Sequence, residues 1–254
     1  MRDGIPFGIK FDVRGHVEVG DRIGKVLHGS PTEQIRKDII SGFYNGTGLS
    51  KIDKIVLVDT GGSERDSTTS LSYSVSGNKL TITCTISITA SYTIDRVRAY
   101  SGTKLYFDTD VTNVTVYSGD KANVTLTITV NVSGSLSGAG VTWSFSDTLI
   151  ASTIIDVLRG TKTSPSDINV GAVRWHVLTP GGEVNWDATA SETLASDGLS
   201  ETVHAEYDTG GQFDIYYIAL LSTGGFEICK WTPDTYPAYN VPEITLIFDC
   251  TISA

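Results

Sequence analysis

Two stretches of the chain carry the apolar spacing of an amphipathic helix. In residues 30–43, SPTEQIRKDIISGF, apolar side chains recur every three or four positions, and residues 146–160, SDTLIASTIIDVLRG, repeat that spacing. The two stripes are Ile35, Ile39, Ile40 and Phe43 in the first stretch, and Leu149, Ile150, Ile154, Val157 and Leu158 in the second. Each stretch therefore predicts a short helix with one buried face.

The residues that flank these stripes predict where the helices begin and end. A capping box with proline in the first turn is expected before the first helix, a Ser or Asp cap before the second, and glycine near both ends. These residues are Ser30, Pro31 and Glu33, then Ser146 or Asp147, and finally Gly42 and Gly160.

Most of the remaining chain alternates apolar residues with Thr, Ser and Asn, which is typical of strands that bury one face and expose the other. In the first half the pattern predicts strands at 52–58, 70–76, 79–89, 92–100, 103–108, 111–117 and 123–133. Gly77 and Asn78 separate two of these strands and predict a hairpin turn. Residues 6–28 predict two further strands that turn at Gly20 and Asp21.

Four segments occur twice in the same order. The helix around Ile39 corresponds to the helix around Ile154, and KIDKIVLVDTGG at 51–62 corresponds to GAVRWHVLTPGG at 171–182. Residues 91–102 then correspond to 211–225, and 123–134 correspond to 243–253. We interpret the chain as two tandem copies of one unit.

The fold class that follows is all-β, with two tandem antiparallel β-sandwich domains of jelly-roll or Ig-like type, each preceded by a short amphipathic helix. The expected division is an N-terminal β-arm or hairpin at 1–29, domain 1 at 30–134, a Gly/Ser linker region at 135–145, and domain 2 at 146–254. The N-terminal strands have no second copy, so we expect them to pack on domain 1 or to serve as an assembly arm.

Charge narrows the classes of partner. The 254 residues carry a formal charge of −10, which disfavours non-specific binding to nucleic acid or to anionic membranes. No apolar run is long enough to cross a bilayer, and residues 1–20 lack the apolar core of a secretory signal. We therefore expect the protein to stay where it is made or to leave the cell inside a particle or by lysis.

The three cysteines predict little chemistry. Cys84 and Cys250 share the phase of buried apolar neighbours, which is typical of core thiols. Cys229 and Cys250 lie in the same half and are a candidate disulfide pair, although sequence alone does not give the distance between them. No zinc-like spacing is present.

Catalytic patterns are missing from the sequence. The four histidines are scattered, and no nucleophile elbow or metallohydrolase spacing occurs. His204 and Glu206 alternate on one expected strand, which is typical of a solvated sheet face. The DTGG segments at 59–62 and 208–211 lack the lysine and helix of a phosphate loop and predict structural turns. The weaker alternative is an isolated calcium ion near Asp59, Glu64 and Asp66, or near Asp108 and Asp110. We expect no enzyme activity, no cofactor and no metal.

Two surface features suggest partners. Trp231, Tyr236 and Tyr239 lie in a proline-rich segment, where aromatic side chains could stack on a glycan or contact a protein, or could instead cover the core of domain 2. Glycosylation sequons occur at Asn45, Asn113, Asn123 and Asn131. The alternation predicts that the last three face solvent.

The order of elements, from GHVEVGDRIGKVLHG through SPTEQIRKDIISGF and IDKIVLVDTGG to NVTLTITVNVS, resembles virion structural proteins of archaeal viruses and tailed phages, of the turret, vertex, tail or fibre type. The resemblance implies a non-enzymatic component of a virion surface that forms homo-oligomers and contacts other virion proteins. Host attachment through a glycan or protein would fit such a role. The alternative is a cell-surface adhesin or a carbohydrate-binding β-sandwich module.

Overall fold

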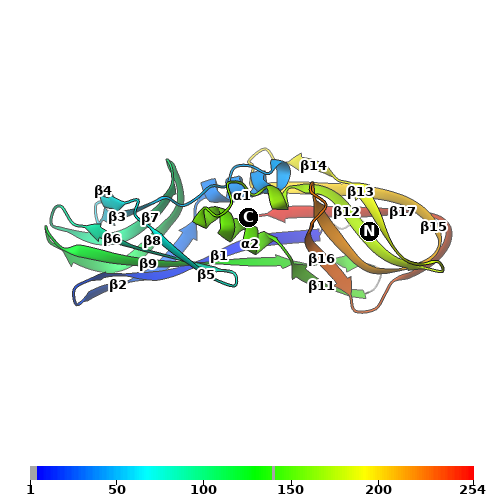
Figure 1. Ribbon diagram of the computed structural model, residues 1–254, viewed down its shortest axis with the longest axis horizontal. Helices are drawn as coiled ribbons and strands as arrows, with labels where there is room; N and C mark the ends of the chain where they lie inside the picture. Colours follow the sequence, from blue (N-terminus) through cyan, green and yellow to red (C-terminus); the bar gives the residue numbers. More distant parts are fainter. Residues whose placement is uncertain (1–4, 139–140) are drawn as a thin grey trace.

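The computed structural model describes residues 5–138 and 141–254, arranged as an elongated molecule with its two helices near the middle (Figure 1). The elements are β1 (Ile5–Val19), β2 (Arg22–Pro31), α1 (Glu33–Asn45), β3 (Lys54–Asp59), β4 (Glu64–Thr68), β5 (Ser72–Ser76), β6 (Lys79–Ser87), β7 (Tyr92–Ser101), β8 (Lys104–Val116), β9 (Lys121–Gly134), β10 (Ser137–Gly138), β11 (Val141–Asp147), α2 (Ile150–Arg159), a 3₁₀ turn η1 (Ser166–Ile168), β12 (Val170–Thr179), β13 (Gly182–Thr189), β14 (Ser191–Leu194), β15 (Ser200–Ser222), β16 (Glu227–Pro233) and β17 (Ala238–Ser253). Strands make up most of the chain, so the predicted all-β class is confirmed.

The first half of the chain, β1 to β9, forms one curled antiparallel sheet. Its strands pair in the order β5, β6, β9, β1, β2, β8, β7, β3, β4. Strand β4, at one end of this series, lies close to β6 near the other end: Asp66 of β4 accepts a hydrogen bond from Thr89, just beyond β6. Most predicted strands are confirmed, with two differences. The strands expected at 103–108 and 111–117 are one strand, β8, and the charged strand β4 was not predicted because it lacks an apolar alternation.

The second half of the chain, β10 to β17, repeats six antiparallel pairings of the first half in the same chain order. The pairings β2–β8, β3–β4, β3–β7, β5–β6, β6–β9 and β7–β8 correspond to β11–β16, β12–β13, β12–β15, β14–β15, β15–β17 and β15–β16. The long strand β15 takes the places of both β6 and β7. The two halves therefore share one pattern of strand connections.

Two separate sandwich domains are not confirmed, because β1 joins the halves. Along its length β1 pairs with β9, and its first residues also pair in parallel with the end of β17, from Ile5 opposite Cys250 to Gly8 opposite Ser253. All the strands thus belong to one large mixed sheet. The buried apolar side chains of both halves and both helices likewise form one connected core.

Both helices contact the half of the chain to which they do not belong. Helix α2 precedes the second-half strands in the chain, yet it packs against β6 and β9 of the first half. Helix α1 contacts β8 of the first half and also β12 and β15 of the second. Each helix end is tied to the segment that follows the other helix: the Ile52 N–H donates to the Leu158 carbonyl at 2.9 Å, and the Asn169 amide donates to the Phe43 carbonyl at 2.9 Å.

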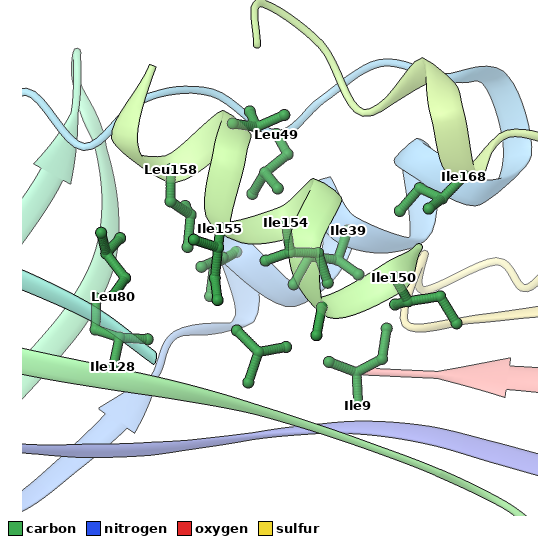
Figure 2. Close-up of a cluster of buried hydrophobic side chains, with 14 of the residues drawn as sticks. Ile9, Ile39, Leu49, Leu80, Ile128, Ile150, Ile154, Ile155, Leu158 and Ile168 are labelled. Atoms are coloured by element: carbon green, nitrogen blue, oxygen red, sulfur yellow. The ribbon is translucent and has the colours of Figure 1, made fainter. Parts of the chain in front are cut away.

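Aliphatic side chains fill the space between the helices and the sheet. Figure 2 shows Ile39 of α1 beside Ile154 of α2, while Ile155 and Leu158 point toward Leu80 and Ile128 of the first-half sheet. These side chains are fully or almost fully buried. Burying such side chains contributes on the order of 2 kcal/mol each, so the exchanged helices link the stability of the two halves.

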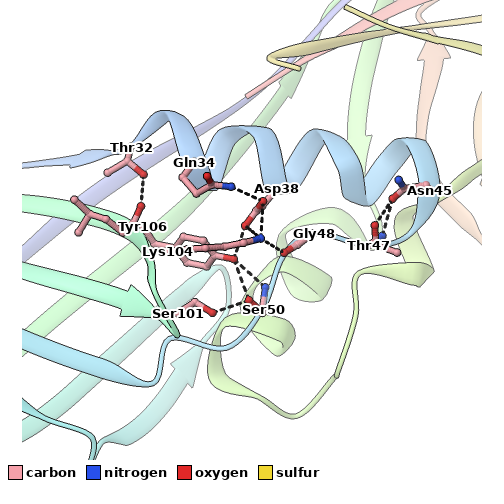
Figure 3. A network of polar contacts seen from close by, with 11 residues as sticks. Thr32, Gln34, Asp38, Asn45, Thr47, Gly48, Ser50, Ser101, Lys104 and Tyr106 are labelled. Atoms are coloured by element: carbon pink, nitrogen blue, oxygen red, sulfur yellow. Dashed lines mark hydrogen bonds and ion pairs between the residues drawn. The ribbon is translucent and has the colours of Figure 1, made fainter. Parts of the chain in front are cut away.

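A buried carboxylate fixes α1 to the first-half sheet (Figure 3). The side chain of Asp38, with an exposed fraction of 7%, accepts hydrogen bonds from Lys104 Nζ at 2.8 Å, Tyr106 Oη at 2.8 Å and Gln34 Nε2 at 2.8 Å. Lys104 also donates to the Gly48 carbonyl, at 3.3 Å. Because the buried charge is both paired and hydrogen-bonded, its desolvation is compensated.

We expect the Asp38→Ala substitution to lower the free energy of unfolding by about 3 kcal/mol, because it leaves the Lys104 ammonium and the Tyr106 hydroxyl without their shared acceptor. Guanidinium denaturation followed by circular dichroism measures this change. The matched control is Glu33→Ala on the same helix, where the side chain is 60% exposed and the denaturation midpoint should not change measurably. Equal effects of the two substitutions would contradict the anchoring role of Asp38.

The predicted helix caps are partly wrong. Helix α1 begins after Thr32 without a side-chain cap, and Ser30 and Pro31 belong to β2, because that strand pairs with β8 up to the helix. Gly46, not Gly42, ends α1 in the left-handed conformation. For α2 the expected cap is confirmed, since the Asp147 carboxylate accepts hydrogen bonds from the Ile150 and Ala151 N–H groups, at 2.8 and 3.1 Å. Gly160 ends that helix as expected.

The segments expected outside the sandwiches belong to the sheet. Residues 135–145, predicted as a linker, contain β10 and most of β11, which pairs with β16. Residues 139 and 140 lie outside the described residues. The N-terminal strands do turn at Gly20 and Asp21, but β1 is an interior strand between β9 and β2 and not a free arm. Apolar alternation along β1, with Phe7, Ile9, Val13 and Val17 buried, explains this central position.

Candidate functional site

A row of aromatic side chains lies on the outer face of the second-half sheet. The ring of His176 on β12 stacks on Tyr217 of β15 with centroids 4.6 Å apart, and it also contacts Tyr216 at 5.8 Å. Tyr216 in turn packs against Tyr236 of the β16–β17 loop at 4.3 Å. A register shift in the β12–β15 pairing, directly after His176, places two consecutive tyrosines of β15 beside the same histidine. We call His176, Tyr216, Tyr217 and Tyr236 the aromatic row.

Polar groups border the aromatic row. Asn185 of β13 hydrogen-bonds His176 Nδ1 at 2.7 Å, and the Glu183 carboxylate lies 3.4 Å from His176 Nε2. Lys230 of β16 lies over the Tyr217 ring, with its Nζ atom 5.2 Å from the centroid. The row therefore presents half-buried ring faces next to an amide, a carboxylate and an ammonium group. Rings for C–H stacking with hydrogen-bonding groups beside them suit a sugar ring or a polar peptide segment.

Exposure differs along the row. The Tyr236 side chain is the most open, with the residue 51% exposed, whereas the His176 side chain is only 18% exposed. Desolvation and the nearby Glu183 charge raise the pKa of Tyr216, so its hydroxyl stays neutral and can donate a hydrogen bond at physiological pH. Packing fixes the position of His176 at the buried end of the row, and the Tyr236 ring at the other end is accessible to a ligand.

The three aromatic residues singled out in the sequence do not form one cluster. Trp231 is fully buried on β16 between Phe145 and Phe248, so the prediction of an exposed binding residue is wrong there, and the core alternative holds. Tyr239 stacks on Phe213, with centroids 4.9 Å apart, and belongs to an inner aromatic group with Trp186. Only Tyr236 reaches the aromatic row. The alternation in EICKWTP places Trp231 in phase with buried Cys229, a signal that the sequence already contained.

The four sequon asparagines are exposed. Asn45 lies at the end of α1, Asn113 on β8, and Asn123 and Asn131 on the outer face of β9. The predicted outward orientation of the three strand residues is confirmed. Asn123 also lines an open hydroxyl-rich hollow of about 430 Å³ with Thr83 and Thr125. Glycosylation itself stays a prediction.

The candidate disulfide is not formed. Cys84, Cys229 and Cys250 are free thiols, and the last two are fully buried. Burial raises the pKa of Cys84 and of Cys250 to about 12, and it raises that of Cys229 as well, so all three stay protonated. Cys250 is a core thiol, as its apolar phase predicts, and so is Cys229, whereas Cys84 is partly buried against the core.

The glycine-rich segments that follow β3 and its counterpart β12 are structural turns. Asp59 Oδ1 accepts hydrogen bonds from the Gly61 and Ser63 N–H groups at 2.9 Å each, and in the second copy the Thr179 hydroxyl accepts from Gly181 at 3.2 Å. The Ser63 N–H and the Arg65 guanidinium lower the pKa of Asp59. Asp59 and Thr179 thus both stabilise the turn that follows them by accepting hydrogen bonds from its backbone N–H groups.

The second DTGG segment, 208–211, is not a turn. It lies inside β15, where the pairing with β17 shifts register between Thr209 and Gly211. A Cβ atom on Gly210 would lie 2.2 Å from the Pro242 carbonyl oxygen, so glycine is needed for the close approach of the two backbones.

His204 pairs with carboxylates on the outer sheet face. Its Nδ1 atom lies 2.7 Å from Asp249 and its Nε2 atom 3.4 Å from Glu206. The hydrogen bond to Asp249 raises the pKa of His204. Among the described residues, no group of three or more His, Cys, Asp or Glu side chains is arranged to hold a metal ion.

One buried carboxyl was not expected from the sequence. Glu201 at the start of β15 is 1% exposed and faces the core with Val203 and Ala205, and neither carboxyl oxygen has a hydrogen-bond partner among residues 5–138 and 141–254. Burial, and then the charge of Glu192, raise the pKa of Glu201 to about 8, and burial raises that of Glu192 to about 7. The sequence signal for this burial was that Glu201 alternates in phase with the apolar residues Val203 and Ala205.

Comparisons with protein-family models, with curated proteins and with solved structures find no match to this chain. In the part of the chain that the structure describes, neither α-helix is long and apolar enough to cross a membrane.

Proposed function

We propose that the chain is a non-enzymatic structural protein of a virion surface, at a capsid vertex or tail, that assembles as a homo-oligomer with other virion proteins. Its two halves are proposed to be copies of one β-unit, which the six repeated pairings support. The order of elements that resembles turret, tail and fibre proteins supports the same assignment.

The observation that carries this proposal is the exchange of the helices. Helix α2 packs on the first half and α1 reaches the second, while β1 joins both parts of the sheet. A single core spanning an elongated molecule resists bending between the halves, since bending would open a packed interior (Figure 1). Such stiffness suits a part that must hold its shape when neighbouring chains press against it.

Size-exclusion chromatography with light scattering on the purified chain tests this proposal. We expect a defined oligomer, or co-assembly with a capsid protein encoded beside the gene. A chain that stays monomeric at all concentrations up to about 500 µM and binds no virion protein would overturn the proposal.

Glycan binding at the aromatic row is the second candidate function, favoured by the open Tyr236 ring, which packs on Tyr216 next to His176. In a virion protein, glycan binding would provide host attachment. In the alternative assignment, the chain would be a cell-surface adhesin or a carbohydrate-binding module.

We expect Tyr236→Ala to weaken binding of a glycan found by array screening about tenfold, because one stacking surface is lost. Titration calorimetry measures the affinity. The control is Tyr44→Ala, which removes a 39% exposed tyrosine on α1, away from the row. Equal affinities of the Tyr236 variant and the control would count against the row as the binding site.

A further inference from the structure

Strand β5 is an open edge of the first-half sheet. Within the described part of the chain it pairs only with β6, from Ser72 opposite Thr83 to Ser76 opposite Lys79, without a register shift. Its sequence, SYSVS, contains no charge and no proline, and four of its five residues are exposed. Edges without a charge, a proline or a bulge are the ones that accept another strand.

The other strands of the described sheet that have a single pairing partner are protected. Strands β4, β13 and β14 also pair on one side only, and β10 is just two residues long. The protecting charges are Glu64, Arg65 and Asp66 on β4, Glu183 and Asp187 on β13, and Glu192 on β14. Since each chain carries a net charge of −10, a neutral edge is the place where two copies can approach with least repulsion.

The hairpin geometry identifies the free backbone groups. A two-residue turn at Gly77 and Asn78 makes Ser76 and Lys79 a hydrogen-bonded pair. Because hydrogen-bonded and non-hydrogen-bonded pairs alternate along the hairpin, the backbone N–H and C=O groups of Ser74 also point toward β6. The N–H and C=O groups of Tyr73 and Val75 consequently point away from β6. Antiparallel pairing of two β5 strands, with Ser74 on the two-fold axis, would join Tyr73 to Val75 of the second copy.

We propose that β5 is a self-association edge that pairs in antiparallel fashion with β5 of a second copy of this chain. This inference rests on the proposed homo-oligomer and names the surface that forms it. The pairing makes about four backbone hydrogen bonds and places the Tyr73 ring next to Val75, an apolar side chain that is 40% exposed in the single chain.

The five-residue interface is smaller than a standard interface of about 1,600 Å², so we expect a dissociation constant of about 100 µM in solution. On a particle, neighbouring chains are held close together, and this raises their effective concentration to the millimolar range. The edge is therefore suited to reinforcing an assembly.

A cysteine scan tests the register. In the proposed pairing the two Ser74 side chains face each other in a non-hydrogen-bonded pair, a spacing that a disulfide can bridge, whereas Ser72 faces Ser76. We expect Ser74→Cys to give cross-linked dimers under mild oxidation, at least about tenfold faster than the Ser72→Cys control on the same face. Equal rates for the two variants would overturn the register.

Sedimentation equilibrium between 10 and 500 µM tests the edge itself. We expect Val75→Pro to abolish association without changing the melting temperature, since its N–H is not used within the chain, and Val75→Lys to do the same should the proline variant fail to fold. Asn113→Lys, at an exposed position on β8, which pairs with neither β5 nor β6, should associate like the wild type. Association that survives both Val75 variants would overturn the edge but not the proposed homo-oligomer, whereas a monomeric wild type would overturn both.

Discussion

Raising the pH from 5 to 9 should lower the free energy of unfolding by about 4 kcal/mol through Glu201 alone, and Glu201→Gln should remove this contribution. Burial raises the pKa of Glu201 to about 8, from an ordinary value of 4.5. The folded chain therefore holds this proton at a pH where the unfolded chain has released it. The stability that the protonated carboxyl contributes is complete below about pH 4.5, and it is lost as the pH rises through about 8.

Urea denaturation at several pH values measures this dependence. The matched control is Glu243→Gln, which changes an exposed glutamate on β17 and should leave the wild-type slope intact. At pH 9 the Glu201→Gln variant should be more stable than the wild type, because an amide needs no proton to stay neutral in the core. A wild-type slope in that variant would show that another group is responsible.

Shortening one side chain in the first half should destabilise the second half. We expect Ile128→Ala on β9 to lower the free energy of unfolding by about 3 kcal/mol and to shift the transition of the whole chain, because Ile128 is fully buried in the core shared with α2. All four tryptophans lie in the second half, so their fluorescence reports on that half alone.

Urea denaturation followed by tryptophan fluorescence and by circular dichroism measures the coupling. Both signals should move to the same lower midpoint in the Ile128 variant and stay at the wild-type midpoint in Lys121→Ala, an exposed control on the same strand. Two independent sandwich domains would give a different result, with an unchanged fluorescence midpoint.

Local patterns predicted the elements well because they depend on near neighbours in the chain. Apolar alternation located β6, β7 and β9 to within about two residues, and the turn at Gly77 and Asn78 is where the sequence indicates. Helix α2 follows its apolar stripe and ends at Gly160. The predictions failed where a distant partner decides the outcome: Ser30 and Pro31 belong to a strand because β8 pairs with them.

The candidate site was predicted only in part for the same reason. Tyr236 was singled out by its irregular, proline-rich segment, but its partners in the aromatic row come from β12 and β15, about 20 to 60 residues away in the sequence. The register shift that brings Tyr216 and Tyr217 beside His176 depends on strand pairing and is invisible to any single-strand pattern. For Trp231 the sequence left partner binding and core burial as alternatives, and only the packing of β16 decided for the core.

By itself, the sequence determined the all-β class, the two short helices, most strands, the repeated order of segments and the outward faces of Asn113, Asn123 and Asn131, because side-chain periodicity and turn chemistry act over a few residues. The tertiary structure alone decided that β1 joins the halves, that α1 and α2 exchange them, that Glu201 lies in the core and that β5 is left open. Each of these depends on contacts between segments far apart in the chain, and their energies arise only when the apolar faces pack together.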